Sequence, residues 1–289
     1  MKIAYVVYLF NRSDHSVEVI KSLIDNNIEE VIVFLDKPKT VSDGEQQHAI
    51  LSYIRNVKDI SIKLVVRPYN YGLALNIRLG LNEVFESGYE AAVVLEDDCV
   101  LEKNGKEFFE LGLVALETNK KIRSLCGYLN KPHSFVFEPD SNLLQISRFN
   151  TWGWATWADR WKDYDPDLRG LVYKEEKKCL KIIDYSPDLD RYCSSPKYLN
   201  REVDIWSINW ILTHFTTNTF CIYPYESVIR NIGFDGTGKN CTASDVFLDV
   251  TFSTDEIRYD WHKLNFFIEN NQISEDFMIK NSQEIYPPY

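Results

Sequence analysis

Short apolar runs alternate with helical patterns through the first hundred residues, and this rhythm constrains the fold more than any other feature. The apolar runs fall at residues 3–9, 31–35, 60–66 and 91–95. Apolar residues at helical spacing lie between them, at residues 17–28, 49–57 and 73–85. Strands joined by helices of this length pair in parallel through right-handed crossovers. We therefore predict an α/β fold, a Rossmann-like and mainly parallel sheet flanked by helices, whose ligands bind at the carboxyl ends of the strands.

The second half of the chain is less regular. Strands are expected at residues 123–127 and 143–146, and a helix at residues 205–215. We predict a single domain over residues 1–240, with a nucleotide-binding half at about 1–100 and an acceptor half at about 101–240. Residues 241–289 are predicted to be a C-terminal extension packed on that domain. Residues 231–240 are rich in glycine and polar side chains, which is the composition of a mobile loop that could close over a ligand.

Charge and cysteine usage narrow the partners. The formal net charge of −11 disfavours nucleic acid and anionic membranes, so an anionic substrate must be held by local groups or by a cation. Six cysteines lack any C-x-x-C pair, and five histidines show neither metal-ligand nor catalytic-triad spacing. No stretch approaches the roughly 20 apolar residues of a membrane-spanning helix. We expect a cytoplasmic protein with at most peripheral contact at the inner membrane face.

The most informative residues are three consecutive acids, Glu96, Asp97 and Asp98. They follow an apolar run, where a buried parallel strand meets the ligand crevice. Carboxylate oxygens suit Mg²⁺ or Mn²⁺, which bind through one or two carboxylates together with the phosphates of a substrate. The alternative is a solvated acidic turn or a helix cap.

Polar residues also follow the other early strands. Asn11 and Arg12 end the first strand and Asp36 ends the second, so these side chains are expected at the same sheet edge. A carboxylate there accepts from a base or ribose, and Arg12 can offer a planar fork to phosphate. Arg67 and Asn70 lie before the third helix, whose N-terminal N–H groups favour an anion. The alternatives are loop solvation, a mutual ion pair, or a capping role for Asn70.

Two further features are candidates for the acceptor half. Four of the seven tryptophans lie in residues 151–161, and we predict that Trp152, Gly153 and Trp154 contact a sugar. Tryptophans at positions 154, 157 and 161 also have helical spacing, which favours core packing. Asp204 precedes an apolar helical stripe, so it could cap that helix or act as a general base towards an attacking hydroxyl.

These pieces, in this order, resemble the nucleotide-sugar transferases of the GT-A fold, particularly the inverting Golgi-type N-acetylglucosaminyltransferases and bacterial polysaccharide glycosyltransferases. The resemblance spans residues 2–240. It is strongest at residues 93–98, which look like the acidic DXD-equivalent motif of that group.

The resemblance implies a role for each of the matching residues. Asp98 would be the metal ligand, and Glu96 and Asp97 would address donor hydroxyls. Arg12 and Asp36 would grip a uridine nucleotide. Residues 200–206 are similar to the segment that carries the catalytic base, with Asp204 as the matching acid, and residues 231–238 resemble the loop that orders over bound donor. Many members add a histidine ligand from a later segment, but residues 223–245 contain none.

We therefore expect an inverting hexosyl- or N-acetylhexosaminyltransferase that depends on Mn²⁺ or Mg²⁺. It would move a sugar from a nucleoside diphosphate donor, a UDP-sugar by resemblance, to a hydroxyl of a glycan or lipid-linked acceptor in bacterial surface polysaccharide synthesis. One alternative is a sugar-nucleotide pyrophosphorylase, but residues 9–13 lack the glycine-rich loop expected after its first strand. The other is a non-catalytic carbohydrate-binding protein.

Overall fold

The computed structural model describes residues 1–131, 141–168, 189, 195–200, 202, 205–237, 252–253, 255–264 and 275–285. The helices and strands follow the chain in the order β1 (Ile3–Leu9), α1 (Ser13–Asp25), β2 (Glu30–Leu35), α2 (Val41–Asn56), β3 (Ser61–Val66), α3 (Leu73–Glu86), β4 (Ala91–Glu96), β5 (Cys99–Leu101), α4 (Gly105–Ala115), β6 (Ile122–Cys126), β7 (Leu143–Ile146), β8 (Trp154–Trp157), α5 (Ala158–Trp161), α9 (Pro196–Leu199), α10 (Trp206–Thr216), β9 (Phe220–Pro224), β10 (Ile229–Asn231) and α12 (Glu275–Ile285).

One large sheet organises the molecule. Its eight strands follow the order β3-β2-β1-β4-β8-β6-β9-β7. The first four strands are mutually parallel, and β6 is parallel to β9. Strand β8 runs antiparallel between β4 and β6, and β7 closes the edge antiparallel to β9. This arrangement confirms the predicted α/β class with a mixed, mainly parallel sheet flanked by helices.

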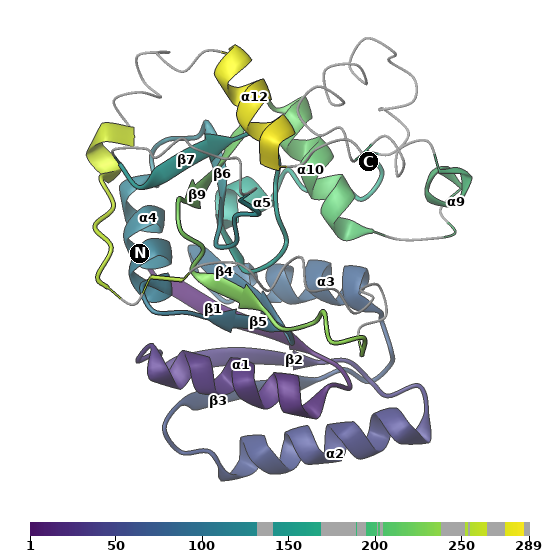
Figure 1. The fold of residues 1–289 in the computed structure, drawn as a ribbon. Helices are drawn as coiled ribbons and strands as arrows, with labels where there is room; N and C mark the ends of the chain where they lie inside the picture. Colours follow the sequence, from purple (N-terminus) through teal and green to yellow (C-terminus); the bar gives the residue numbers. More distant parts are fainter. Residues whose placement is uncertain are drawn as a thin grey trace.

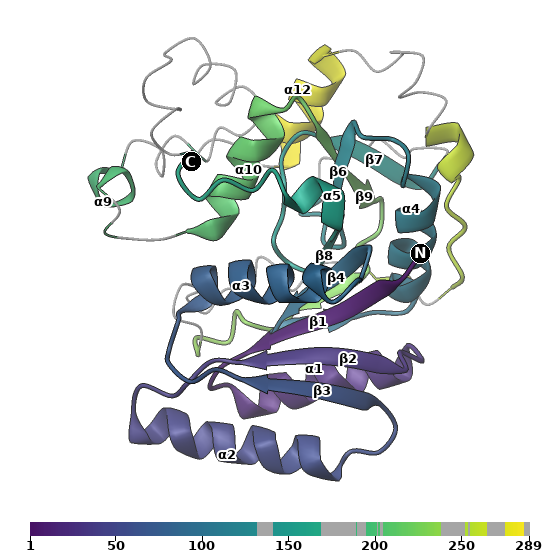
Figure 2. The same ribbon diagram turned by 180° about the vertical axis from the view of Figure 1, so that it is seen from behind.

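Helices cover both faces of the sheet. Helices α1, α2 and α4 pack on one face, and α3 and α10 pack on the other, as the two opposite views show (Figures 1 and 2). The central strands are buried on both sides, which explains their continuous apolar sequences. The described part of the tail adds to both cores, because Trp261 and Leu264 join the first and Ile285 joins the second. Within the described residues, no helix is long and apolar enough to cross a membrane.

Helix α2 begins eight residues before the apolar pattern that predicted it. Its first two turns are polar, so helical periodicity does not reveal them. The start is fixed instead by a capping box, in which Thr40 Oγ1 accepts from the Asp43 N–H at 3.1 Å and Asp43 Oδ2 accepts from the Thr40 N–H at 2.9 Å. Reciprocal bonds of this kind satisfy N–H groups that a helix start otherwise leaves unpaired.

The tryptophan-rich segment departs from its predicted helical pattern. Trp154 and Trp157 are the two ends of strand β8, and only the four-residue helix α5 follows them. Since side chains alternate along a strand, residues three apart face opposite sides. Trp157 accordingly packs in the core beneath α1 and α4, whereas Trp154 packs with α3 and α10. The spacing of the tryptophans therefore reflects a strand buried on both faces.

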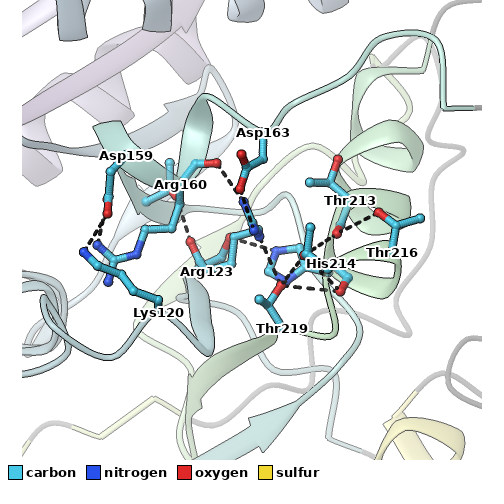
Figure 3. A network of polar contacts seen from close by, with 12 residues as sticks. Lys120, Arg123, Asp159, Arg160, Asp163, Thr213, His214, Thr216 and Thr219 are labelled. Carbon is cyan, nitrogen blue, oxygen red and sulfur yellow. Dashed lines mark hydrogen bonds and ion pairs between the residues drawn. The ribbon is translucent and has the colours of Figure 1, made fainter.

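A polar network lies at the end of the sheet where the interior strands β4 and β6 begin (Figure 3). Arg123 donates to Thr219 Oγ1 at 3.1 Å, to the Arg160 carbonyl at 2.7 Å and to Asp163 at 2.9 Å. Arg160 is 3% exposed and donates to the carbonyls of Leu116 and Glu117 at 3.0 and 2.6 Å, just beyond the end of α4. These two arginines satisfy carbonyl oxygens that would otherwise be buried without a partner.

Among the five histidines, His214 belongs to this network. Its side chain is completely buried, and its Nε2 lies 3.0 Å from Ser124 Oγ. Burial, together with the nearby charge of Arg123, lowers the pKa of His214 well below its usual value. The imidazole is therefore a neutral part of the core.

Candidate functional site

The order of the first four strands reverses direction between β1 and β4. From β1 the chain proceeds outward through β2 and β3, and then returns through α3 to β4 on the other side of β1. Helices α1 and α3 lie on opposite faces of the sheet, so the chain changes face where it passes from β3 to β4 (Figures 1 and 2). Such a switch point, at the carboxyl ends of the strands, is where open α/β sheets bind ligands.

The residues at this switch point carry opposite charges. Arg12 follows β1, and Asp97 and Asp98 follow β4. One guanidinium nitrogen, Arg12 Nη2, donates to Asp97 Oδ1 and also to Asp98 Oδ2, the latter at 2.8 Å. Burial opposes the charge of Arg12, but the hydrogen bonds and charges of the two aspartates outweigh it and raise its pKa. The acidic pair thus already binds a cation, supplied by the chain itself.

The third acid, Glu96, has a different environment. It pairs in register with Tyr8, and its carboxylate makes no hydrogen bond to any described residue. Burial and then the charges of Asp98 and Asp97 raise the pKa of Glu96 to about 8. Burial also raises the pKa of Asp97, against the opposing effect of its hydrogen bond from Arg12. This environment favours the protonated form of Glu96, which can donate a hydrogen bond.

A two-stranded ribbon brings a distant segment over these acids. Strands β5 and β10 pair antiparallel, with Asn231 opposite Cys99. The pairing continues as the Ile232 N–H donates to the Asp98 carbonyl at 2.9 Å. Residues 231–237, which we call the roof, therefore lie against the acidic turn.

The roof is fixed at three points. Gly233 lies so close to the acids that an added Cβ would overlap Asp98 Oδ2 and lie 3.1 Å from Arg12 Nη1. Phe234 packs edge-on against Trp152, with ring centroids 5.2 Å apart. On the opposite side, His15 Nε2 lies 3.3 Å from Asp235 Oδ2 and 3.1 Å from the Ile232 carbonyl oxygen. A ligand that reaches the acids must share this space with the roof.

Gly233→Ala should displace the roof while leaving the core intact. The added methyl would collide with Asp98, and Gly233 lies outside both hydrophobic cores. We expect the affinity for UDP with Mn²⁺ to fall by about tenfold or more, equivalent to about 1.4 kcal/mol, with little change in melting temperature. Calorimetry and thermal melting would check both. Gly44→Ala is the matched control, because its Cβ meets nothing within 4 Å; unchanged nucleotide affinity in Gly233→Ala would show that the roof does not shape the site.

Three of the predicted donor-binding residues connect loops at this edge. Asn11 donates to Asp43 Oδ1 at 2.7 Å and so joins the end of β1 to the start of α2. Asp36 accepts from the N–H groups of Tyr71 and Gly72, each at 2.8 Å. Asn70 donates to the Lys37 carbonyl at 2.6 Å and does not cap α3, whose N-cap is Gly72. These side chains shape the rim, and their contact with a donor stays a prediction.

The side chain of Arg67 is buried and makes contacts within the fold. It is 6% exposed, and donates to Asn76 Oδ1 at 2.8 Å and Glu83 Oε1 at 2.6 Å. Its guanidinium also lies over the Phe34 ring, 4.6 Å from the centroid. These contacts bind the β3 end to α3 and leave Arg67 little surface for phosphate.

The predicted sugar-contacting residues divide into two groups. Trp152 is partly exposed and lies between Phe234 and Tyr128, whose ring centroid is 4.6 Å away. Gly153 has φ +63°, and an added Cβ would collide with Ile229. Trp154 is completely buried, so its predicted contact with a ligand is wrong in this structure, since no part of the indole is reachable. Asp204, the predicted catalytic base, lies outside the described residues.

The sequence interpretation missed residues that the structure brings to the site. His15 was assigned no role, yet it holds the roof from the first turn of α1. Tyr128, a buried core residue, packs edge-on against Trp152. His15 and Ile232 are 217 residues apart, and no local pattern links such positions. Only the position of His15 one helical turn after Arg12 hinted that it faces the same crevice.

The acidic pair fits a hard divalent cation. Among the described residues, no group of three or more His, Cys, Asp or Glu could enclose a metal ion by itself. Mg²⁺ and Mn²⁺ do not require such a cage, because they bind through one or two carboxylates and complete their coordination with water and phosphate. Asp97 and Asp98 supply two carboxylates that already neutralise a cation, and the backbone of Gly233 packs directly against Asp98.

Comparisons with known proteins show partial similarities of structure. No family model and no curated protein matches the sequence. TarS 1-349 from S. aureus in complex with UDP-GlcNAc is 17% identical with a TM-score of 0.34, over 49% of this chain and 38% of that chain. The mannosyltransferase PcManGT from Pyrobaculum calidifontis, in complex with GDP-Man and Mn²⁺, is 12% identical with a TM-score of 0.39, over 55% and 45%. Mannose-1-phosphate geranyltransferase from Thermus thermophilus is 13% identical with a TM-score of 0.38, over 78% and 74%. This chain therefore spans less than half the length of the first two, and its function is inferred from its own residues.

Proposed function

We propose that this chain is a divalent-metal-dependent glycosyltransferase of the GT-A type, which transfers a sugar from a nucleoside diphosphate donor to a hydroxyl acceptor. The observation that carries the proposal is the convergence of Arg12, Asp97 and Asp98 at the switch point of the sheet, beneath the roof. A cation-binding acidic pair and a guanidinium at the carboxyl end of parallel strands are suited to a diphosphate.

Each part of the site has a role in this proposal. Asp97 and Asp98 would hold Mn²⁺ or Mg²⁺, and that cation would stabilise the charge that develops on the leaving diphosphate. Arg12 would bind the phosphates, and Glu96 would form a hydrogen bond with a hydroxyl of the donor. The roof would exclude water and so limit hydrolysis of the donor.

The finer assignments extend this proposal. Asp204 would act as the general base that deprotonates the acceptor hydroxyl, which gives inversion at the anomeric carbon by a single displacement. Trp152, a partly exposed aromatic residue beside the roof, would stack on the apolar face of a sugar. A UDP-sugar is the proposed donor, and a glycan or lipid-linked carrier of bacterial surface polysaccharide is the proposed acceptor.

A calorimetric titration tests the proposal directly. Purified protein is titrated with UDP, GDP, CMP and their sugar conjugates, first with Mn²⁺ and then with a chelator. Binding of one nucleotide that disappears with the chelator is the expected result, and it would identify the donor class. If no nucleotide binds while free oligosaccharides do, the chain is a carbohydrate-binding protein and the transferase proposal fails.

A further inference from the structure

The acidic pair has an internal counter-cation. Both hydrogen bonds from Arg12 come from one nitrogen, Nη2, which lies between the Asp97 and Asp98 carboxylates. Charge-assisted bonds of this kind are short and strong, and the side chains involved are between 11% and 17% exposed. The position that neutralises the two acids is thus taken before any ligand arrives.

Arg12 and a metal ion compete for the same oxygen atoms. Asp97 Oδ1 and Asp98 Oδ2 accept from Arg12, and they are the carboxylate oxygens that the pair turns towards each other. The backbone of Gly233 closes the remaining side, with Arg12 Nη1 at 3.1 Å from its Cβ position. A divalent cation placed there would meet a guanidinium at contact distance, where like charges repel most strongly. Arg12 must therefore move away when the metal binds.

Arg12 also needs a new anion when it leaves. Burial disfavours its charge in this crevice, so a guanidinium without a carboxylate would be costly. A diphosphate bound beside the acids supplies that anion, because guanidinium and phosphate oxygens form a bidentate, charge-assisted pair. The metal likewise needs phosphate oxygens, since the protein offers it two carboxylates.

We propose that Arg12 is an exchangeable counter-cation, which holds the acidic pair in the free protein and moves to the diphosphate when metal and nucleotide bind together. The inference rests on the proposed function and deepens it. Its consequence is that metal binding and nucleotide binding depend on each other. The metal alone binds weakly, because it must displace Arg12 while no diphosphate is present to pair with the guanidinium. The nucleotide alone meets two acids that are already paired with Arg12. Each ligand raises the affinity for the other by the same factor.

The test compares Mn²⁺ binding in wild type and Arg12→Gln by electron paramagnetic resonance of the free ion, with and without UDP. Without nucleotide, we expect Arg12→Gln to bind Mn²⁺ about tenfold or more tightly than wild type, because the competitor is gone. We also compare the factor by which UDP raises the Mn²⁺ affinity in the two proteins. This factor should be smaller in Arg12→Gln than in wild type by about tenfold or more, which is within the typical range of coupling between two sites. A role in folding alone would neither raise the Mn²⁺ affinity nor lower the enhancement by UDP.

Matched variants keep the result interpretable. Arg230→Gln removes the exposed arginine of strand β10, which pairs with Glu102 at 2.6 Å, and it should leave Mn²⁺ affinity unchanged. Arg12→Lys keeps the charge but offers a point donor in place of a planar fork, so its Mn²⁺ affinity should fall between those of wild type and Arg12→Gln. If Arg12→Gln folds poorly, Arg12→Lys tests the same competition between Arg12 and the metal. Adding Asp98→Asn to either variant should remove the gained affinity.

The outcomes separate this inference from the proposed function. Mn²⁺ affinity that is unchanged or weaker in both Arg12 variants would overturn the exchange, whatever nucleotides bind. If no nucleotide binds wild type but Arg12→Gln gains Mn²⁺ affinity, then Arg12 competes with the metal, and both the diphosphate half of the exchange and the transferase proposal are overturned. A UDP enhancement equal in wild type and Arg12→Gln would show that Arg12 does not move to the diphosphate.

Discussion

Asp98→Asn should lower sugar transfer by about a thousandfold or more and abolish the metal-dependent binding of UDP. Asparagine matches aspartate in shape but removes one of the two negative charges that would hold the cation. A bound metal contributes several kcal/mol of charge stabilisation in the transition state, and about 4 kcal/mol corresponds to a factor of about a thousand. The fold should survive, because the Asp98 carbonyl that accepts from Ile232 at 2.9 Å belongs to the backbone.

The measurement is release of UDP from a panel of UDP-sugars with acceptor, together with calorimetry of UDP in Mn²⁺. Glu86→Gln is the matched control, since it also removes one carboxylate but from an exposed position near the end of α3. Its activity should equal that of wild type. Transfer by Asp98→Asn within about tenfold of wild type would remove the acidic pair from the mechanism.

Arg160→Met should be the most destabilising single change outside the hydrophobic cores. The guanidinium is buried, donates to two carbonyls beyond the end of α4, and stacks over the Trp157 ring at 4.0 Å. Methionine replaces the apolar stem but leaves those carbonyls without their donor. Loss of a buried charged donor costs about 3–5 kcal/mol, which for a chain of this size corresponds to a fall in melting temperature of about 10 °C.

Lys120→Met is the matched control for this change, and thermal melting is the measurement. Lys120 pairs with Asp159 at 2.6 Å, as Arg160 does at 2.8 Å, but Lys120 is 62% exposed (Figure 3). Exposed pairs contribute about 0–1 kcal/mol, so its melting temperature should hardly change. Folded Arg160→Met should still bind nucleotide in a metal-dependent manner. The polar network lies beside the first residue of β4, whereas the acidic pair follows its last residue, so the two sites are at opposite ends of this strand. Equal melting temperatures in the two variants would contradict the assigned role of Arg160.

Much of the fold follows from local sequence, and the exceptions have physical causes. The predicted strands and helices of residues 1–96 all exist, because each strand is a short apolar run and each helix buries a periodic stripe. Strand β8 was not predicted, since a strand buried on both faces shows no alternation of polar and apolar residues. The short strands β5 and β10 exist only because they pair with each other, and no local property identifies such a partner.

The candidate site divides in the same way. Arg12, Asp97 and Asp98 could be placed together from the sequence, because the ends of parallel strands meet at one edge. Trp154 was misplaced because the sequence did not show that strand β8 is covered by α3 and α10. The contact of His15 with the roof depends on tertiary packing between distant segments. The functional roles assigned to the site residues stay predictions, and these residues are Asn11, Arg12, Asp36, Arg67, Asn70, Glu96, Asp97, Asp98, Trp152, Gly153 and Asp204.

Because β5 pairs with the distant strand β10, the site is completed late in the synthesis of the chain. Asp98 and Ile232 are joined by a hydrogen bond although more than a hundred residues separate them in the chain. The ribosome therefore releases Arg12 and the acidic turn long before it releases the roof. During that interval Arg12 can already neutralise the acids, so the emerging sheet need not carry two unpaired carboxylates at its edge. A nascent chain shorter than about 233 residues has the charges of the site but not its enclosure, which is completed only when the roof emerges.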